Sequence, residues 1–286
     1  MKRNIIILLY YVLIMISCGQ SSEVSGLKRL SKLSKLLSES SGITQLKLNT
    51  FWLINDSGNS NELFQIDASG TIIQVVAVTN AFNIDWEDLA SDGDSRLFIG
   101  DFGNNHNDRK DLAIYSVDTK DIKNNRVKAS KISFFYEDQH QFPPKKKKRN
   151  YDVEAFFYHN EHFYLFTKNR SSDFDGTTKL YCLPAIPGSQ KAKLVGSFKT
   201  CVNEKKCKVT AADINHQGNK AVLLMHDKLL VFSEFSVDDF FSGKVKEVKL
   251  HHNSQKEAVC FGLDGKLYIT DEHIKKTGGN LYQLSL

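Results

Sequence analysis

Polar and acidic side chains recur in a short motif that returns five times along the chain. Each copy has one polar or acidic residue, a second one two or three positions later, and then an apolar residue that begins a hydrophobic run. The copies lie at residues 39–43, 85–89, 152–156, 210–214 and 255–259, so they recur every 45 to 67 residues. A repeat of this period indicates an architecture of repeated units, in which corresponding residues meet at one common site.

The recurring positions form three columns when the copies are aligned. The first column holds Glu39, Asp85, Asp152, Thr210 and Gln255. The second, two residues further on, holds Ser41, Glu87, Glu154, Ala212 and Glu257. The third, from the ends of the apolar runs that follow, holds Asp56, Asp101, Lys168, Asp227 and Asp271. Side chains two residues apart on a strand lie on the same side of it, so the columns are expected to ring one mouth.

So many carboxylates in a narrow mouth cannot all be ionised without compensation. Protonation, pairing with the few nearby cations or a bound metal ion would each supply it. Hard carboxylate oxygens suit Ca²⁺ or Mg²⁺, and the sequence has no cysteine or histidine spacing typical of zinc. We therefore expect a Ca²⁺ site, and the alternative is a structural ring of acids that cap strands. The expected metal ligands are Glu39, Asp56, Asp85, Glu87, Asp101, Asp152, Glu154, Asp227, Glu257 and Asp271.

A basic segment over 143–149 directly precedes the third copy of the motif. It is expected to arch over the acidic face, where Lys168, Arg170 and Asn104 would contact an anionic ligand. The alternative is a solvated run of charge. Nucleic acid is not an expected partner, because no aromatic residues alternate with these lysines.

Between the motifs, the sequence reads as short strands separated by turn residues. The expected inner strands cover 41–46, 87–90, 154–159, 211–215 and 257–262. Four units hold four strands and the last holds three, so a segment near 27–35 would supply the missing outer strand. Such closure removes exposed sheet edges. The sequence therefore predicts an all-β, five-bladed β-propeller of four-stranded blades closed by an N-terminal strand, with a six-bladed ring as the alternative.

The N-terminus has the pattern of an export signal. Lys2 and Arg3 precede an apolar run over 5–16, which is too short for a comfortable membrane span. The run ends in Met15-Ile-Ser-Cys18, which looks like a bacterial lipobox with Cys18 as the lipidated residue; an ordinary signal peptide is the alternative. The expected organisation is a lipoprotein signal peptide over 1–17, a lipid-anchored tether over 18–26 and one propeller domain over 27–286. An anchored protein of this kind is expected in the cell envelope, on the outer membrane facing the periplasm, with surface exposure left open.

Four cysteines remain after Cys18, and an exported protein can keep disulfides. Cys201 and Cys207 flank a short polar loop whose ends can meet, so we expect a disulfide between them. Cys182 and Cys260 lie within apolar strand patterns and are expected to be buried free thiols.

The paired motif resembles the SdiA-regulated and esterase-like-phytase group of β-propellers, and exported lipoproteins of Bacteroidota-type bacteria look similar. The resemblance covers about 39–286. Inner-strand glutamates also resemble those of the calcium-activated nucleotidases, which implies Ca²⁺ at the axis near Glu39, Glu87, Glu154 and Glu257. The fourth copy departs from this pattern, because Thr210-Ala-Ala212 replaces its acids.

Two functions follow from these features. The first is a lipid-anchored binding or scaffold module, expected to be a monomer, that presents its mouth to a small-molecule, glycan or protein ligand. The second is a metal-dependent hydrolase of a phosphoester or lactone. The sequence has no Gly-x-Ser-x-Gly elbow, and only His226 and His273 lie near the expected mouth as candidate bases. The binding function is therefore preferred.

Overall fold

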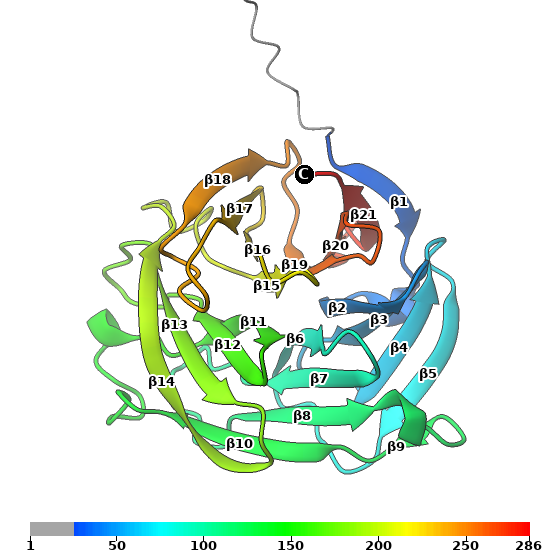
Figure 1. The fold of residues 1–286 in the computed structure, drawn as a ribbon, viewed down its shortest axis with the longest axis horizontal. Helices are drawn as coiled ribbons and strands as arrows, with labels where there is room; N and C mark the ends of the chain where they lie inside the picture. The colour runs from blue at the N-terminus through cyan, green and yellow to red at the C-terminus, as the bar shows by residue number, and fades with distance from the viewer. Residues whose placement is uncertain (1–25) are drawn as a thin grey trace, which may run out of the picture.

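A computed structural model describes residues 26–286 as an all-β propeller, which confirms the predicted fold class. The lipobox with Cys18, and the tether up to residue 25, lie outside the described residues. Hydrogen bonding groups the strands into sheets of four, eight, four and five strands around a central axis (Figure 1). Dividing the eight-stranded sheet at its parallel pairing gives five antiparallel sets of four main strands, which we number as blades 1 to 5. Among residues 26–286, no helix is long and apolar enough to cross a membrane.

Each blade is an antiparallel sheet whose first strand lies at the axis. Blade 1 contains β2 (Ser40–Lys47), β3 (Thr50–Asn55), β4 (Glu62–Asp67) and β5 (Ile72–Val78). Blade 2 contains β6 (Trp86–Ser91), β7 (Arg96–Asp101), β8 (Ala113–Asp118) and β10 (Ser130–Tyr136). Blade 3 contains β11 (Val153–His159), β12 (His162–Thr167), β13 (Thr177–Pro184) and β14 (Gly188–Lys199). Blade 4 contains β15 (Ala211–Ile214), β16 (Lys220–Leu224), β17 (Lys228–Ser233) and β18 (Lys244–Lys249).

Blade 5 is assembled from both ends of the propeller. It contains β19 (Lys256–Phe261), β20 (Leu267–Asp271), β21 (Asn280–Leu284) and, as its outer strand, β1 (Lys28–Lys32). β1 pairs antiparallel with β21, from Lys28 opposite Gln283 to Lys32 opposite Asn280. This pairing confirms the predicted closing strand. It ties the first described strand to the last, so ring closure satisfies backbone groups that would otherwise form two sheet edges.

Three short 3₁₀ helices and one short strand lie between the main strands. They are η1 (Lys35–Leu37), η2 (Thr119–Asp121), η3 (Lys146–Lys148) and β9 (Arg126–Val127). β9 adds to the outer edge of blade 1 in parallel with β5. The outer strands of blades 2 and 3, β10 and β14, also pair in parallel and join these blades into one eight-stranded sheet. The sequence analysis did not predict this junction.

The hydrophobic core lies between the blades. Nearly all residues of the inner and second strands are buried, and five apolar clusters each span two neighbouring blades. Aromatic residues fill the junction of blades 2 and 3, where Phe102 meets Phe156 edge to face at 5.1 Å between ring centroids. This packing fixes the inner strands side by side, with all their first residues at one mouth of the axis.

Closure by the N-terminal segment can be tested with two adjacent leucines. Leu37 is fully buried in the cluster that joins blades 1 and 5, whereas Leu36 is 63% exposed. We expect Leu37→Ala to lower the free energy of unfolding by about 2 to 5 kcal/mol, because it leaves a cavity in that core. Leu36→Ala should change it by no more than about 0.5 kcal/mol. Urea unfolding measures both, and equal losses would contradict the packing described here.

Candidate cation site at the axial mouth

A β-bulge recurs at the start of the inner strand in four of the five blades. The pairing with the second strand skips one residue there, and the skipped residues are Ser41, Glu87, Glu154 and Glu257. A bulge re-aims the side chain of the extra residue. The four skipped residues are the second column of the sequence motif. Blade 4, whose residue in that column is Ala212, pairs without such a shift.

The bulged side chains meet in one narrow cavity of about 90 Å³ at the axis. The cavity is lined by Ser41, Asp56, Glu87, Asn105, Glu154, Lys168, Arg170, Gln255, Glu257 and Glu272. Eight of these residues were singled out in the three columns or as expected ligand contacts. The repeat therefore predicts the position of the cavity, although not its complete lining.

Three carboxylates on one side of the mouth are close enough to share an ion. Asp56, Asp85 and Glu87 each offer an oxygen atom, and these atoms lie within 4.8 Å of one another. Burial raises the pKa of Asp56 to about 6 and also raises the pKa of Asp85. Burial and then the charge of Glu154 raise the pKa of Glu87 well above its ordinary value. Among residues 26–286, no Lys, Arg or His forms an ion pair with any of the three.

The other side of the mouth is already neutralised by cations of blade 3. Lys168 Nζ lies 2.8 Å from one oxygen of Glu154, and the Arg170 guanidinium lies 2.6 Å from the other. Arg170 also pairs with Asp152. Burial acts to raise the pKa of Glu154, but Lys168 and Arg170 outweigh it and hold that pKa below its ordinary value. Two neighbouring glutamates therefore differ: Glu154 is stabilised as the anion, and Glu87 is not.

A wider cavity of about 530 Å³ opens beside the narrow one and shares part of its lining. Its wall includes Lys168 and Arg170, and also Lys205, Lys208 and His226. His226 Nε2 lies 3.2 Å from an oxygen of Glu257. Positive charge thus surrounds the entrance to the acidic cavity.

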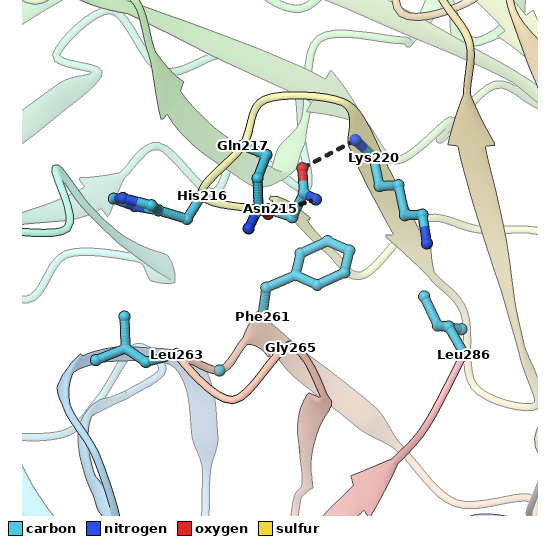
Figure 2. Close-up of a pocket in the computed structure, with 9 residues that line it drawn as sticks. Asn215, His216, Gln217, Lys220, Phe261, Leu263, Gly265 and Leu286 are labelled. Atoms are coloured by element: carbon cyan, nitrogen blue, oxygen red, sulfur yellow. Dashed lines mark hydrogen bonds between the residues drawn. The ribbon is translucent and has the colours of Figure 1, made fainter.

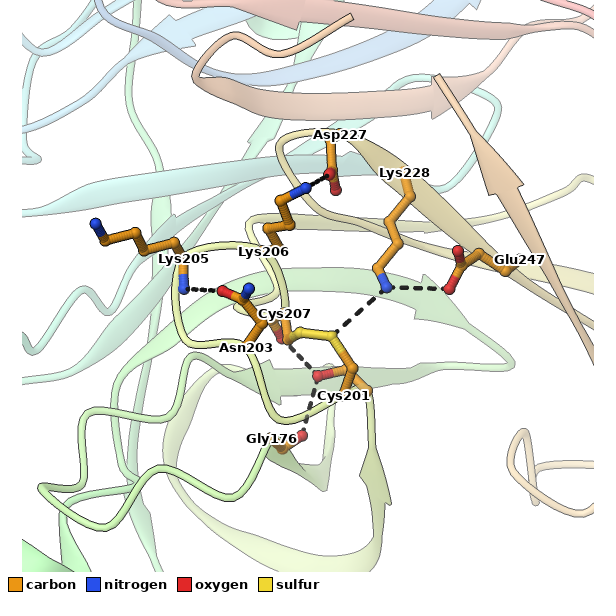
Figure 3. The surroundings of a disulfide bond; sticks show 10 residues. Gly176, Cys201, Asn203, Lys205, Lys206, Cys207, Asp227, Lys228 and Glu247 are labelled. Atoms are coloured by element: carbon orange, nitrogen blue, oxygen red, sulfur yellow. Dashed lines mark hydrogen bonds and ion pairs between the residues drawn. A yellow bond between two sulfur atoms is a disulfide. The ribbon is translucent and has the colours of Figure 1, made fainter. Parts of the chain in front are cut away.

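The entrance is bordered by the loop between blades 3 and 4 (Figure 3). The structure joins Cys201 and Cys207 in the disulfide expected from their spacing, and the loop between them carries Lys205. Thr200 Oγ1 donates to the backbone oxygen atoms of Gly176 and Cys207, which fixes the base of the loop. Cys260 is a buried free thiol as expected, and Cys182 is a half-buried one.

Six of the expected ligands do not line either cavity at the axial mouth. Of these, Asp85 lies with Asp56 and Glu87, and Asp152 pairs with Arg170, whereas the other four are held elsewhere. Asp101 receives hydrogen bonds from Arg109 at 3.0 Å and from the backbone N–H of Asp85 at 3.1 Å. Asp271 receives them from the backbone N–H of Asn280 and from the Tyr282 hydroxyl, each at 2.8 Å. Both aspartates therefore form their hydrogen bonds with groups of their own blades.

Asp227 and Glu39 complete this group. Asp227 forms an ion pair with Lys206 at 3.4 Å and faces a separate cavity beside blade 4. Glu39 is exposed and accepts a hydrogen bond from Asn59. The expected complete ring of acids is thus wrong in its geometry for these four positions.

For Asp101 and Asp271, the reason is a shift of one residue in the third column of the motif. Asp101 and Asp271 are paired strand residues, opposite Trp86 and Lys256. Asp56 and Lys168 instead follow the last paired residues of β3 and β12, so their side chains point to the other side of the sheet.

Because of this shift, the sequence analysis missed Glu272. It follows Asp271 as Asp56 follows Asn55, and it lines the narrow cavity. Gln255 Nε2 donates to its carboxyl at 2.6 Å. Burial, and then the charge of Glu257, raise the pKa of Glu272 to about 8. Aligning the second strands by their last paired residues, Asn55, Thr167 and Asp271, identifies it.

Asn104 does not face the ligand space. Its Oδ1 accepts the backbone N–H groups of Asp108 and Arg109, and its Nδ2 donates to the backbone oxygen of Tyr151. These bonds use both ends of the amide, so Asn104 supports the loop rather than contacting a ligand. Its neighbour Asn105 lines the cavity instead.

The basic segment lies beside the mouth on the same face. Arg170 N–H donates to the backbone oxygen of Arg149 at 3.0 Å, and Ser172 N–H donates to that of Lys146 at 3.1 Å. Lys145 to Lys148 are all exposed, and Lys147 pairs with Asp173 at 3.1 Å. The segment therefore borders the acidic face, and within residues 26–286 its lysines form no ion pair with the carboxylates of the axial cavity.

The fold and this mouth define the chain as a β-propeller protein with a polar axial site. The sequence matches no protein-family model and no curated protein. Among solved structures, a PQQ-bound aldose sugar dehydrogenase from Streptomyces coelicolor is similar with a TM-score of 0.56 and 10% identity, over 92% of this chain and 97% of that chain. A structural genomics protein of unknown function from Bacteroides thetaiotaomicron has a TM-score of 0.51 and 9% identity, over 91% and 75%. At such identities the likeness concerns the propeller fold alone, and the SdiA-regulated type stays a prediction.

The raised pKa of Glu272 predicts how stability depends on pH in the presence of a chelator. The folded protein holds this proton up to about pH 8, whereas the unfolded chain releases it near 4.5. Stability contributed by the group is therefore present at low pH and is lost as the pH rises towards 8. We expect Glu272→Gln to flatten the fall in melting temperature between pH 5 and 8 and to raise it at pH 8. An unchanged slope would contradict the burial of this carboxyl.

Proposed function

We propose that the axial mouth binds a divalent cation of the calcium class through Asp56, Asp85 and Glu87, and that the protein is a binding module of the cell envelope. The observation that carries this proposal is the cluster of three carboxylates with raised pKa values and no paired cation. A bound cation would stabilise their ionised forms together, beyond what the hydrogen bonds of Ser57 and the charges of Arg109 and Arg170 supply.

The donor set favours Ca²⁺ over Mg²⁺ or a transition metal. Calcium accepts six to eight oxygen ligands in flexible geometry, whereas Mg²⁺ requires a near-octahedral set. Ser41 and Asn105 line the same cavity and offer neutral oxygen atoms beside the carboxylates. The cavity residues include no cysteine. A set of carboxylate, hydroxyl and amide oxygens is the chemistry that hard cations prefer.

The ligand that fits over this cation is an anionic small molecule. Lys168, Arg170, Lys205 and Lys208 line the wider cavity, whose volume is in the range of small-molecule sites. A carboxylate or phosphate group there would meet both the cation and these side chains. Glu204 in the same wall neutralises part of this positive charge.

The anchor proposed at Cys18 has a consequence for orientation. β1 begins at Lys28, opposite Gln283 of the last strand, and ends near Gly278 at the acidic face. The chain thus enters the propeller on the face opposite the acids. A lipid on Cys18 would hold the acidic mouth away from the membrane surface, where soluble ligands reach it.

A second candidate function, metal-dependent hydrolysis of a phosphoester or lactone, is favoured by one contact. His226 and Glu257 form a pair at 3.2 Å that faces the wider cavity. A histidine held by a carboxylate can act as a general base towards water, and a nearby cation can polarise the substrate. Without a nucleophile in place beside the carboxylates, binding remains the preferred function.

The cation site is tested by melting the purified protein with calcium and with chelator. We expect Ca²⁺ at one hundred times its Kd to stabilise the fold by about 2.7 kcal/mol, because only the folded state assembles the ligands. Glu87→Gln and Asp56→Asn should abolish the shift in melting temperature. Asp227→Asn, which alters a carboxylate in a separate cavity, should retain it. No shift in the unaltered protein would overturn the proposal.

Turnover assays separate binding from hydrolysis. We expect no calcium-dependent release of 4-nitrophenol from 4-nitrophenyl phosphate and no opening of a γ-lactone. If turnover does occur, a general base at His226 requires His226→Gln to lower kcat by about 10²–10⁴ while the calcium shift persists. The matched change His106→Gln, at an exposed histidine, should leave that rate unaltered.

A further inference from the structure

The opposite mouth of the propeller holds a second pocket of different chemistry. Two adjoining cavities, of about 290 and 340 Å³, lie where the inner strands end. They share the lining residues Asn215, His216, Gln217, Phe261 and Leu263. We propose that this pocket binds a neutral saccharide, independently of the axial cation.

All five blades contribute to this pocket. It is lined by Gln45 of blade 1, Ser91 of blade 2, Tyr158 of blade 3, Asn215 of blade 4 and Phe261 of blade 5. The inner strands therefore present their first residues to the acidic mouth and their last residues here. Side chains on strand ends of a packed ring are held more firmly than side chains on free loops.

The two carboxylates that line this pocket already have partners within the protein, and Lys220 lines the smaller cavity with an exposed side chain. Asp92 accepts three backbone N–H groups and pairs with Arg96 at 2.7 Å. Asp213 accepts the backbone N–H of Phe261 at 2.6 Å. Burial lowers the pKa of His159, which favours the neutral imidazole. The pocket is thus prepared for a neutral ligand, in contrast to the acidic mouth.

The remaining polar groups are amides and hydroxyls. Gln45 is 5% exposed, and its Oε1 accepts the N–H of Leu263 at 2.7 Å, which leaves the two donors of Nε2 for a ligand. Thr44 and Ser91 place their hydroxyls 2.9 Å apart beside it. Gln217 is exposed at the rim, and its Oε1 accepts from Asn215. Such groups can each donate and accept, as the hydroxyls of a sugar require.

An apolar platform completes the pocket. Figure 2 shows the ring of Phe261 projecting towards the loop of Asn215 and Gln217, with Leu263 and Leu286 on either side. Pyranose rings have an apolar C–H face and a rim of hydroxyls. A ring face bordered by amide and hydroxyl groups matches both parts of that surface, and it binds neither a metal ion nor a highly charged molecule well.

The loops around the pocket are closely packed. Gly218 has φ +67°, and a Cβ there would lie 2.6 Å from the ring of His159 in the neighbouring blade. His216 lies against Gly93, where a Cβ would be 3.4 Å from its Nδ1. Loops of blades 2, 3 and 4 thus meet at this mouth, so the pocket needs little rearrangement to accept a ligand.

The test is saturation-transfer NMR on the purified full chain with glucose, maltotriose, cellotriose, chitotriose and xylotriose as probes. We expect at least one of them to bind saturably, with the same affinity in calcium and in chelator. Gln45→Met should weaken binding about tenfold, since a buried amide donor is lost. Phe261→Ala should weaken it by a similar factor. Gln217→Ala alters an exposed rim residue and should weaken it about threefold without affecting the fold.

Gln141→Ala is the matched control, because Gln141 is an exposed glutamine in the loop before blade 3, at the acidic face. It should leave saccharide affinity unaltered. Absence of binding by all five probes at millimolar concentration would overturn the proposal. So would affinity that is equal in the unaltered protein, Phe261→Ala and Gln217→Ala, or tighter binding of glucose 6-phosphate than of glucose. If the unaltered protein binds a saccharide but its melting temperature does not rise with calcium, only the proposed cation site is refuted.

Discussion

Repulsion among buried carboxylates is the constraint on which the acidic mouth depends. Ring closure forces the first residues of all five inner strands towards one axis, and four bulges turn their polar side chains inward. Glu87 and Glu154 then lie so close that the charge of one raises the pKa of the other. Such a cluster persists in a folded protein only when protons, internal cations or a bound ion compensate it. The blades differ in how their carboxylates are compensated. In blade 3, Lys168 and Arg170 neutralise Glu154, whereas the carboxylates of blades 1 and 2 need a proton or a metal ion.

Blade 4 departs from the repeat, and the acidic site is open on the side of this blade. Blade 4 has Ala212 where the others have a polar bulged residue, and Thr210 uses its hydroxyl to bond the backbone oxygen of Lys256. The wall of carboxylates is therefore open on this side. The wider cavity lies in that opening, next to the disulfide loop and its lysines. A fully symmetric ring would surround the proposed ion completely, whereas the broken ring leaves space for a second ligand beside it.

The sequence predicted the propeller, its closing strand and the second column of the site, because all three depend on period and on strand alternation. It did not predict which residue of each second strand faces the axis. A shift of one residue moves a side chain to the other face, so Asp271 was selected in place of Glu272. The lysines of the disulfide loop were also missed, since their approach to the mouth depends on contacts far apart in sequence. Asn104 was misassigned for a related reason: a turn composition typical of ligand oxygens also suits an amide that bonds to its own loop.

The cavities at the two mouths share no lining residue, and Asp88 and Asp213 lie on inner strands that run from one mouth to the other. Asp88 is 1% exposed and accepts the backbone N–H groups of Leu89 and Phe156. Burial raises its pKa well above the ordinary value, and burial raises the pKa of Asp213 to about 7. Each side chain crosses to the neighbouring blade and satisfies inner-strand donors, so these residues act as structural links rather than as ligands. Each mouth therefore has its own chemistry: bulged acids where the inner strands begin, and neutral amides around an aromatic ring where they end.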